Sequence, residues 1–175
     1  EYLRIDNANA FNFTNTFSIM FWFRADDDQP TNVTSTLHPM VSKWDAHSVS
    51  AYPFTIRFID RRSSKPRRVQ AQVWDTVNNP VVVTPTNLDT NYHHVAFVRK
   101  GSLLMLFYDG VLSDYGVFSI GSVANDNPIY FGRNGGLLSF RGALDDVQFW
   151  NRAVSHAEVL HLMHNDPNFS DPTLV

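Results

Sequence analysis

The sequence contains no cysteine, only two glutamates and no apolar run of the length that crosses a membrane. The first absence excludes disulfides, thiolate zinc sites and cysteine nucleophiles. Because the two glutamates are Glu1 and Glu158, a hydrolase that needs a pair of carboxylates would have to use aspartates alone. The third absence gives no indication of membrane insertion.

Charge is scarce as well, and what there is lies unevenly along the chain. Charged residues make up 18% and the net charge is −3. The pI near 6.1 argues against nucleic acid as a partner. Residues 57–68 nevertheless hold six of the fourteen cationic side chains, and residues 26–28 are three consecutive aspartates. The sequence therefore predicts a local basic patch on a weakly acidic protein.

The hydrophobic residues that are present indicate one packed β domain. At 175 residues, with 43% hydrophobic and 14% aromatic residues, the chain is long enough for a full core. Strand-like runs separated by polar or Gly/Pro loops recur along it, which is typical of an all-β protein. The expected strands are residues 2–5, 17–24, 39–43, 54–60, 68–75, 80–84, 93–100, 103–109, 129–132 and 143–150. Asp109-Gly110 fits a tight reversal.

The segment 140–163, FRGALDDVQFWNRAVSHAEVLHLM, ends a strand and begins a helix. The pair Asp145-Asp146 interrupts the apolar residues of the strand and indicates a local irregularity. Ser155 and Glu158 have the spacing of a capping box, in which the hydroxyl accepts from a backbone N–H and the glutamate reaches back. A short helix is expected directly after Ser155.

This segment resembles the C-terminal signature of laminin-G-like, concanavalin-A-like jelly rolls, where a Gly-x-acid-Asp-Val strand leads to an aromatic residue, Asn-Arg-Ala and a short helix. Further pieces resemble the family in the expected order. They are FSIMFWFR at 17–24, VSK at 41–43, YHHVAFVR at 92–99, LMLFYDG at 104–110 and IYFG at 129–132. The resemblance implies an all-β, two-sheet antiparallel sandwich (jelly roll) with one short C-terminal helix over residues 1–165. Residues 166–175 would be a tail or linker.

Strand alternation indicates which side chains can reach a ligand, because successive strand residues point to opposite faces. In strand 54–60 the apolar set leaves Arg57 facing outward, and in strand 68–75 it leaves Gln70, Gln72 and Trp74 outward. If the two strands are neighbours, these side chains form one cluster. A ring that stacks on a sugar, flanked by amides and a guanidinium, is typical of a glycan site.

Neighbouring cations and a loop tryptophan extend this candidate site. Arg57, Arg67 and Arg68 favour an acidic polysaccharide, such as one bearing uronate or sulfate, through bidentate contacts to its acidic groups. Trp44, in a polar loop beside Asp45, is a second candidate for stacking on a sugar. Two structural interpretations stay open, since a charged hairpin tip protects a sheet edge and another element could cover Trp74.

The acidic residues raise the question of a metal. Many members of the family hold a calcium ion where loops meet the last strand, and the resemblance places Asp145 and Asp146 at the matching positions. Calcium takes about six to eight oxygens, and two adjacent strand aspartates need a bulge to face one ion. A structural Ca²⁺ is one interpretation, and hydrogen bonding within the fold is the other. The run at 26–28 is either a second calcium site on the rim or a solvated loop.

Catalysis is the least supported class. The Glu-x-Asp-x-x-Glu strand of the jelly-roll glucanases is absent. A lyase could pair His94 with Tyr108 as base and acid, although the family uses this histidine segment as scaffold.

The sequence therefore predicts a non-catalytic, lectin-like carbohydrate-binding module of a larger secreted or cell-surface protein. Its expected partners are a glycan or polysaccharide, with acidic polymers favoured, and other domains of the parent protein. The location would be extracellular or at the cell surface, and bacterial, since a vertebrate module of this kind would more often carry a disulfide. The alternative is a structural or adhesion module with a protein partner or a spacer role, and a lyase or glycosidase comes third.

Overall fold

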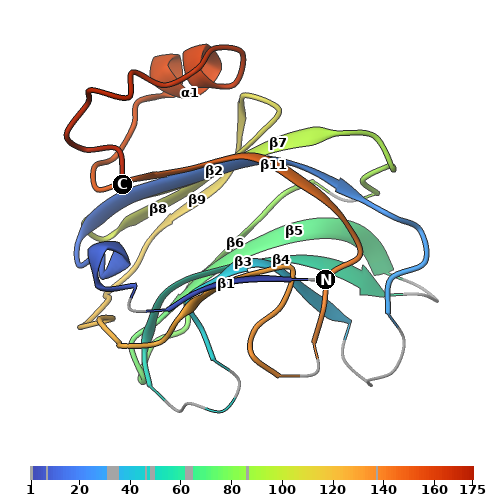
Figure 1. The fold of residues 1–175 in the computed structure, drawn as a ribbon, viewed down its shortest axis with the longest axis horizontal. Coiled ribbons are helices and arrows are strands. Elements are labelled where there is room, and N and C mark those ends of the chain that lie inside the picture. Colours follow the sequence, from blue (N-terminus) through green and yellow to red (C-terminus); the bar gives the residue numbers. More distant parts are fainter. Residues whose placement is uncertain are drawn as a thin grey trace.

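The computed structural model describes residues 2–6, 8–30, 36–45, 47, 50–61, 65–85, 87–136 and 138–175, without the side chains of residues 61, 65 and 66. Two antiparallel sheets face each other as a sandwich, and one short helix lies outside the upper sheet (Figure 1). The predicted all-β, two-sheet sandwich with a C-terminal helix is confirmed.

The lower sheet has six strands in the order β1-β10-β3-β4-β5-β6. Their bounds are Leu3–Ile5 (β1), Ile129–Phe131 (β10), Leu37–Ser42 (β3), Tyr52–Arg61 (β4), Lys65–Trp74 (β5) and Val81–Val83 (β6). In Figure 1 the central strands of this sheet, β4 and β5, are arched, so that their ends bend away from the upper sheet. The outer face of the lower sheet is therefore concave.

The upper sheet has five strands in the order β11-β2-β7-β8-β9. Their bounds are Gly142–Trp150 (β11), Thr16–Ala25 (β2), His93–Lys100 (β7), Leu103–Tyr108 (β8) and Val111–Val117 (β9). The predicted reversal joins β8 to β9, and Asp109 and Gly110 both have the positive φ (47° and 78°) of a tight hairpin turn. β9 itself was not predicted, because Ser113, Asp114 and Gly116 dilute its apolar pattern.

The main core lies between the sheets and follows the alternation of the strands. Phe54, Ile56 and Phe58 of β4 are fully buried there, together with Val69 and Ala71 of β5. The residues between them point to the concave outer face. A short 3-10 helix, η1 (Asn9–Phe11), precedes β2.

A second apolar layer lies on the outer side of the upper sheet, beneath α1 (His156–Leu162). The predicted capping box is confirmed: Glu158 N donates to Ser155 Oγ at 3.3 Å, and Ser155 N donates to Glu158 Oε2 at 2.7 Å. The buried residue of the helix is Val159. It belongs to a cluster with Met20, Ala96, Val98, Phe107, Trp150 and Val154. α1 has seven residues, and no helix in the described residues could cross a membrane.

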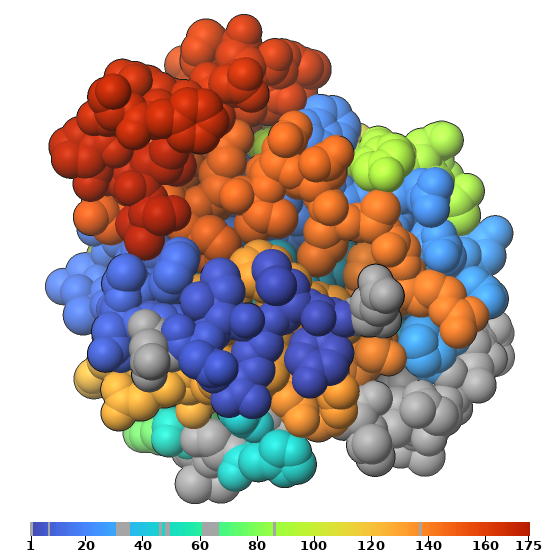
Figure 2. All heavy atoms as spheres, viewed as in Figure 1, coloured from blue at the N-terminus to red at the C-terminus, as the bar shows by residue number. Residues whose placement is uncertain are grey.

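The residues that follow the helix fold back along β11. Leu174 pairs with Trp150, and Val175 N donates to Phe149 O at 2.9 Å. Figure 2 shows this segment (red) resting on the body of the domain beside β11 (orange). The division between a domain at 1–165 and a tail at 166–175 stays a prediction.

Candidate functional site

The concave face brings together the four outward side chains predicted for the central strands. β4 and β5 pair so that Arg57 lies opposite Gln70 and Tyr52 lies opposite Trp74. Arg57 Nη2 donates to Gln72 Oε1, and Gln70 Nε2 donates to the same oxygen at 3.3 Å. Arg57, Gln70 and Gln72 are called the polar cluster below. Their ligand-binding role stays a prediction.

An aromatic row borders the polar cluster. The ring centroids of Trp44 and Tyr52 are 5.8 Å apart, and those of Tyr52 and Trp74 are 5.6 Å apart. Both tryptophans are half-buried, whereas Tyr52 is buried. The row therefore joins the two tryptophans that the sequence singled out separately.

The alternation pattern alone does not indicate Tyr52, the middle ring of the row. Counting back by two from the inward Phe54 places Tyr52 in the core. The pairing of β4 with β5 shifts between Tyr52 and Thr55, and this irregularity turns Tyr52 to the concave face. Pro53 between them is a signal for it, because proline cannot donate to a ladder and is found at bulges.

Gln72 is the centre of the hydrogen bonds on this face. Its Nε2 donates to Tyr52 Oη at 2.6 Å and to Asn79 Oδ1, while its Oε1 accepts from Arg57. Burial raises the pKa of Tyr52 to about 12 against the opposing effect of Arg57, so the phenol stays protonated at neutral pH. The amide thus fixes the positions of a ring and a guanidinium at once.

Arg57 is a buried cation with unused hydrogen-bonding capacity. Its exposed fraction is 9%, and its Nε is buried without a hydrogen-bond partner in the described part of the chain. Thr55 Oγ1, two residues away on the same face, is also buried without one. Burial lowers the pKa of Arg57, but a guanidinium remains charged in proteins. Each such buried group costs about 1–3 kcal/mol unless something bonds to it.

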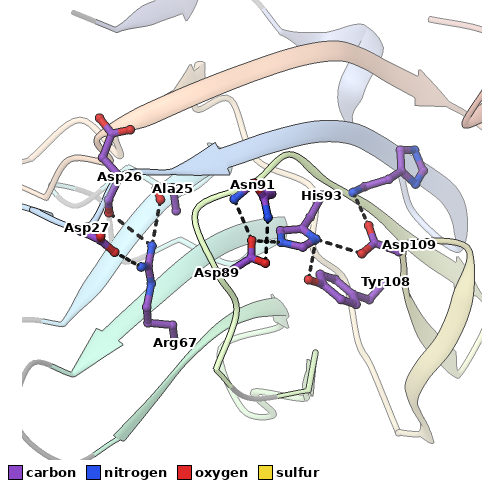
Figure 3. A network of polar contacts seen from close by, with 10 residues as sticks. Ala25, Asp26, Asp27, Arg67, Asp89, Asn91, His93, Tyr108 and Asp109 are labelled. Carbon is purple, nitrogen blue, oxygen red and sulfur yellow. Dashed lines mark hydrogen bonds and ion pairs between the residues drawn. The ribbon is translucent and has the colours of Figure 1, made fainter.

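Arg67 lies apart from this cluster, and its predicted ligand-binding role stays a prediction. It forms an ion pair with Asp27, and its Nη2 donates to Ala25 O at 2.8 Å (Figure 3). Its guanidinium also lies 5.2 Å from the ring centroid of Phe58, a core residue. Arg67 therefore lies on the side of β5 that faces the other sheet. Of the predicted basic hairpin at residues 61–68, residues 62–64 and the side chains of residues 61, 65 and 66 lie outside the described part of the chain.

Trp44 is held in position by the buried residue before it. Lys43 Nζ donates to Asn127 O at 2.7 Å and to Asn125 O at 3.2 Å. Asn125 Nδ2 donates in return to Lys43 O at 3.2 Å and to Ala51 O at 2.6 Å. Burial lowers the pKa of Lys43 to about 8. These bonds tie both ends of the connection between β3 and β4 to the segment before β10.

The acidic run at 26–28 consists of paired aspartates. Asp26 lies 3.4 Å from Arg24, and Asp28 forms an ion pair with Arg141. Asp27 is the partner of Arg67. These pairs favour the interpretation as a solvated loop over that as a calcium site.

Asp145 and Asp146 lie at the predicted irregularity of β11, whose pairing with β2 shifts between Asp145 and Gln148. Both aspartates are exposed, and Asp146 N donates to Asp145 Oδ1 at 2.9 Å. In the residues that the structure describes, no group of three or more His, Asp or Glu side chains is suited to a metal. Two carboxylates supply fewer than the six to eight or so oxygens of calcium, so backbone and water would have to provide the rest. The calcium ion stays a prediction.

The pair considered for lyase chemistry does not form. Tyr108 Oη lies 2.6 Å from Nδ1 of His93, and Asp89 and Asp109 lie 2.9 Å from the two ring nitrogens of the same histidine (Figure 3). His94 points to the opposite face of β7 and is 2% exposed. Burial lowers its pKa to about 4. It is a neutral scaffold residue at pH 7.

The sequence matches a laminin-G-type family model of the concanavalin A-like lectin/glucanases superfamily over residues 1–160. The chain belongs to this superfamily, as its resemblance predicted. A search among curated proteins found no match.

Solved structures share the fold at low sequence identity. Domain 4 of AbnA, a GH43 extracellular arabinanase from Geobacillus stearothermophilus in complex with arabinotriose, has a TM-score of 0.61 and 15% identity over 92% of this chain and 71% of that one. Domains LG4-5 of the mouse laminin alpha1 chain give 0.61 and 16%, over 88% and 41%. The binding domain of botulinum neurotoxin DC, in complex with rat synaptotagmin II, gives 0.64 and 12%, over 92% and 39%. The chain therefore spans less than half of the laminin and toxin chains.

Proposed function

We propose that this chain is a non-catalytic carbohydrate-binding module and that the concave face of the six-stranded sheet binds the glycan. The observation that carries the proposal is the aromatic row of Trp44, Tyr52 and Trp74 beside the polar cluster. Two of its rings are half-buried on an outer sheet face, where they gain less from packing than core residues do.

The chemistry of this face suits equilibrium recognition of a saccharide. Aromatic side chains offer a large flat apolar area that can lie against the C–H face of a sugar ring. The amides and the guanidinium beside them can donate to hydroxyl oxygens. Because Gln72 already holds Tyr52 and Arg57 in place, little side-chain entropy is lost when a ligand binds.

The polar cluster on this face offers no carboxyl group for glycoside hydrolysis. Hydrolysis uses two carboxyl groups on either side of the scissile bond, and the polar cluster contains none. Asp45, next to Trp44, is occupied: its Oδ2 accepts from Tyr130 Oη at 3.0 Å, and its Oδ1 accepts from His47 N at 2.9 Å. The proposal therefore assigns no catalytic step to this chain.

The setting of the module is also part of the proposal. We place it in a larger bacterial protein at or outside the cell surface. The arabinanase with the same fold is described as extracellular, and its domain 4 was solved with arabinotriose. The proposed partners are a polysaccharide and the other domains of the parent protein.

A glycan array followed by titration calorimetry tests the proposal. We expect the folded protein to bind at least one saccharide, and Trp74→Ala to weaken that binding about tenfold or more. Tyr115→Ala is the matched control, because Tyr115 is 65% exposed on β9 of the other sheet. An array without hits in calcium-containing buffer, or binding that both variants leave unchanged, would contradict the proposal.

A protein-binding or adhesion role is the second candidate, and the edge strand β9 favours it. Val111, Tyr115 and Val117 are 68%, 65% and 76% exposed there. Such apolar groups at a sheet edge can pair with another chain. In that case Tyr115→Ala, rather than Trp74→Ala, would abolish attachment to the partner.

A further inference from the structure

We propose that the glycan bound on the concave face carries a carboxylate and that Arg57 binds it; this rests on the glycan-binding function proposed above. The ligand class is a saccharide containing a sugar acid, such as a hexuronate.

The first argument is the missing counter-charge. Arg57 is 91% buried, since its exposed fraction is 9%, and it forms no ion pair with any residue that the structure describes. Its side-chain hydrogen bond goes to the neutral amide of Gln72, and the phenol of Tyr52, which acts on it electrostatically, is protonated. A buried charge without an opposite charge is costly, which a negatively charged ligand would relieve.

Several other arginines of the chain have the ion-pair partner that Arg57 lacks among the described residues. Arg67 pairs with Asp27, Arg141 pairs with Asp28, and Arg152 lies 2.7 Å from Glu158. Arg99 is also buried without an ion pair to a described residue. Arg99, however, lies on the core side of β7, where its Nε donates to Gly101 O and Asp75 supplies an attractive field. Arg57 combines an unmatched charge with a place on an outer face.

The second argument is the free hydrogen-bonding capacity around this guanidinium. Nη2 of Arg57 donates to Gln72, and Nε has no partner within the described ranges. Nη1 makes no hydrogen bond there either and is not among the fully buried atoms, so it is the group that a ligand reaches first. Thr55 Oγ1, on the same face of β4, is also without a hydrogen-bond partner in the described residues, but Thr55 is fully buried.

Together these groups match a carboxylate better than a hydroxyl. A carboxylate is planar, carries two acceptor oxygens and forms charge-assisted bonds with a guanidinium that are about twice as strong as neutral ones. A sugar hydroxyl would accept one bond and leave the charge of Arg57 uncompensated. The aromatic row would hold the sugar ring while Arg57 selects its acidic group.

Calorimetry with matched ligands tests this at about 150 mM salt, where long-range attraction is screened. The probes are short oligohexuronates (galacturonate, mannuronate, guluronate and glucuronate series), the carboxyl-reduced form of each, and sialyllactose as a second source of a carboxylate. We expect at least one acidic probe to bind about tenfold or more tighter than its neutral counterpart. Binding of sialyllactose alone, with Arg57 required, would support the carboxylate and identify a sialic acid as its source.

The variants assign the effect to Arg57. Arg57→Gln should remove the preference, and Arg57→Lys should keep part of it because a point charge remains without the fork. Lys100→Gln removes the same charge from an exposed position on β7 and should leave the preference unchanged. Circular dichroism checks whether each variant folds. If Arg57→Gln does not fold, the comparison of acidic and carboxyl-reduced probes on the wild type, together with Arg57→Lys, still tests the proposal.

The remaining outcomes are distinguishable. Equal binding of acidic and carboxyl-reduced probes, abolished by Trp74→Ala, overturns the carboxylate and leaves glycan binding intact. A preference that survives in Arg57→Gln overturns the role of Arg57. Binding of no saccharide overturns both proposals.

Discussion

The outer faces of the two sheets differ in how far other parts of the chain cover them. On the five-stranded sheet, α1 and the C-terminal residues cover a second apolar layer, and Trp150 is 2% exposed. On the six-stranded sheet, Trp44 and Trp74 are half-buried near Arg57, which has no ion pair with a described residue. Tryptophan therefore packs into the apolar layer on one face and stays partly accessible to a ligand on the other. What covers a tryptophan, rather than its presence, indicates whether it can bind a ligand.

Truncating one tryptophan on each face tests this difference most directly. Trp150→Ala should lower the free energy of unfolding by about 4 kcal/mol, because it removes the largest side chain of the layer under α1. Trp74→Ala should lower it by about 1 kcal/mol, because that ring is only half-buried. Urea denaturation followed by tryptophan-independent circular dichroism measures both. Equal losses would mean that the concave face is packed as part of the scaffold.

A buried histidine on the covered face should make stability depend on pH. His94 has its pKa lowered to about 4 by burial, whereas an unfolded histidine titrates near 6.5. Between these values the unfolded chain binds the proton more readily, so stability falls as the pH drops from 6.5 to 4 and is unaffected above that range. The loss approaches about 3 kcal/mol, at 1.36 kcal/mol for each pKa unit.

Urea denaturation at several pH values between 4 and 7.5 measures this loss. In His94→Leu the part of the loss that is due to His94 should vanish, because leucine does not titrate. The substitution removes no hydrogen bond of Nδ1, which has no partner in the described residues. The exposed His47→Gln should behave like the wild type, because His47 is not among the groups that act on His94. If His94→Leu retains the full slope, carboxylates rather than His94 control the acid limit of the fold.

The sequence predicts most of the scaffold because local rules and burial agree there. Alternation in β4 and β5 identifies Phe54 and Val69 as core residues and Arg57 as outward, and the capping box places the start of α1. These features depend on neighbouring residues along one strand or one turn.

The candidate site is predicted less completely because it depends on contacts distant in sequence. Tyr52 reaches the concave face only through a shift in strand pairing, which strict alternation does not contain. Arg67 has the same parity in β5 as the inward Val69, but its ion-pair partner, Asp27, lies 40 residues earlier in the chain and cannot be read from the strand pattern. Which arginine is paired is a tertiary property, and it separates Arg67 from Arg57.

The smallest expected effect concerns the helix that makes the two faces different. Ser155→Ala removes one half of the capping box and should cost about 1 kcal/mol of unfolding free energy, while Ser119→Ala, in an exposed loop, should cost almost nothing. Differential scanning calorimetry resolves the two. Because α1 covers the opposite sheet, the capping variant should bind saccharides as the wild type does. A capping variant with weakened binding would show that the covered face and the concave face are coupled through the core, and the two faces could then not be treated as separate in function.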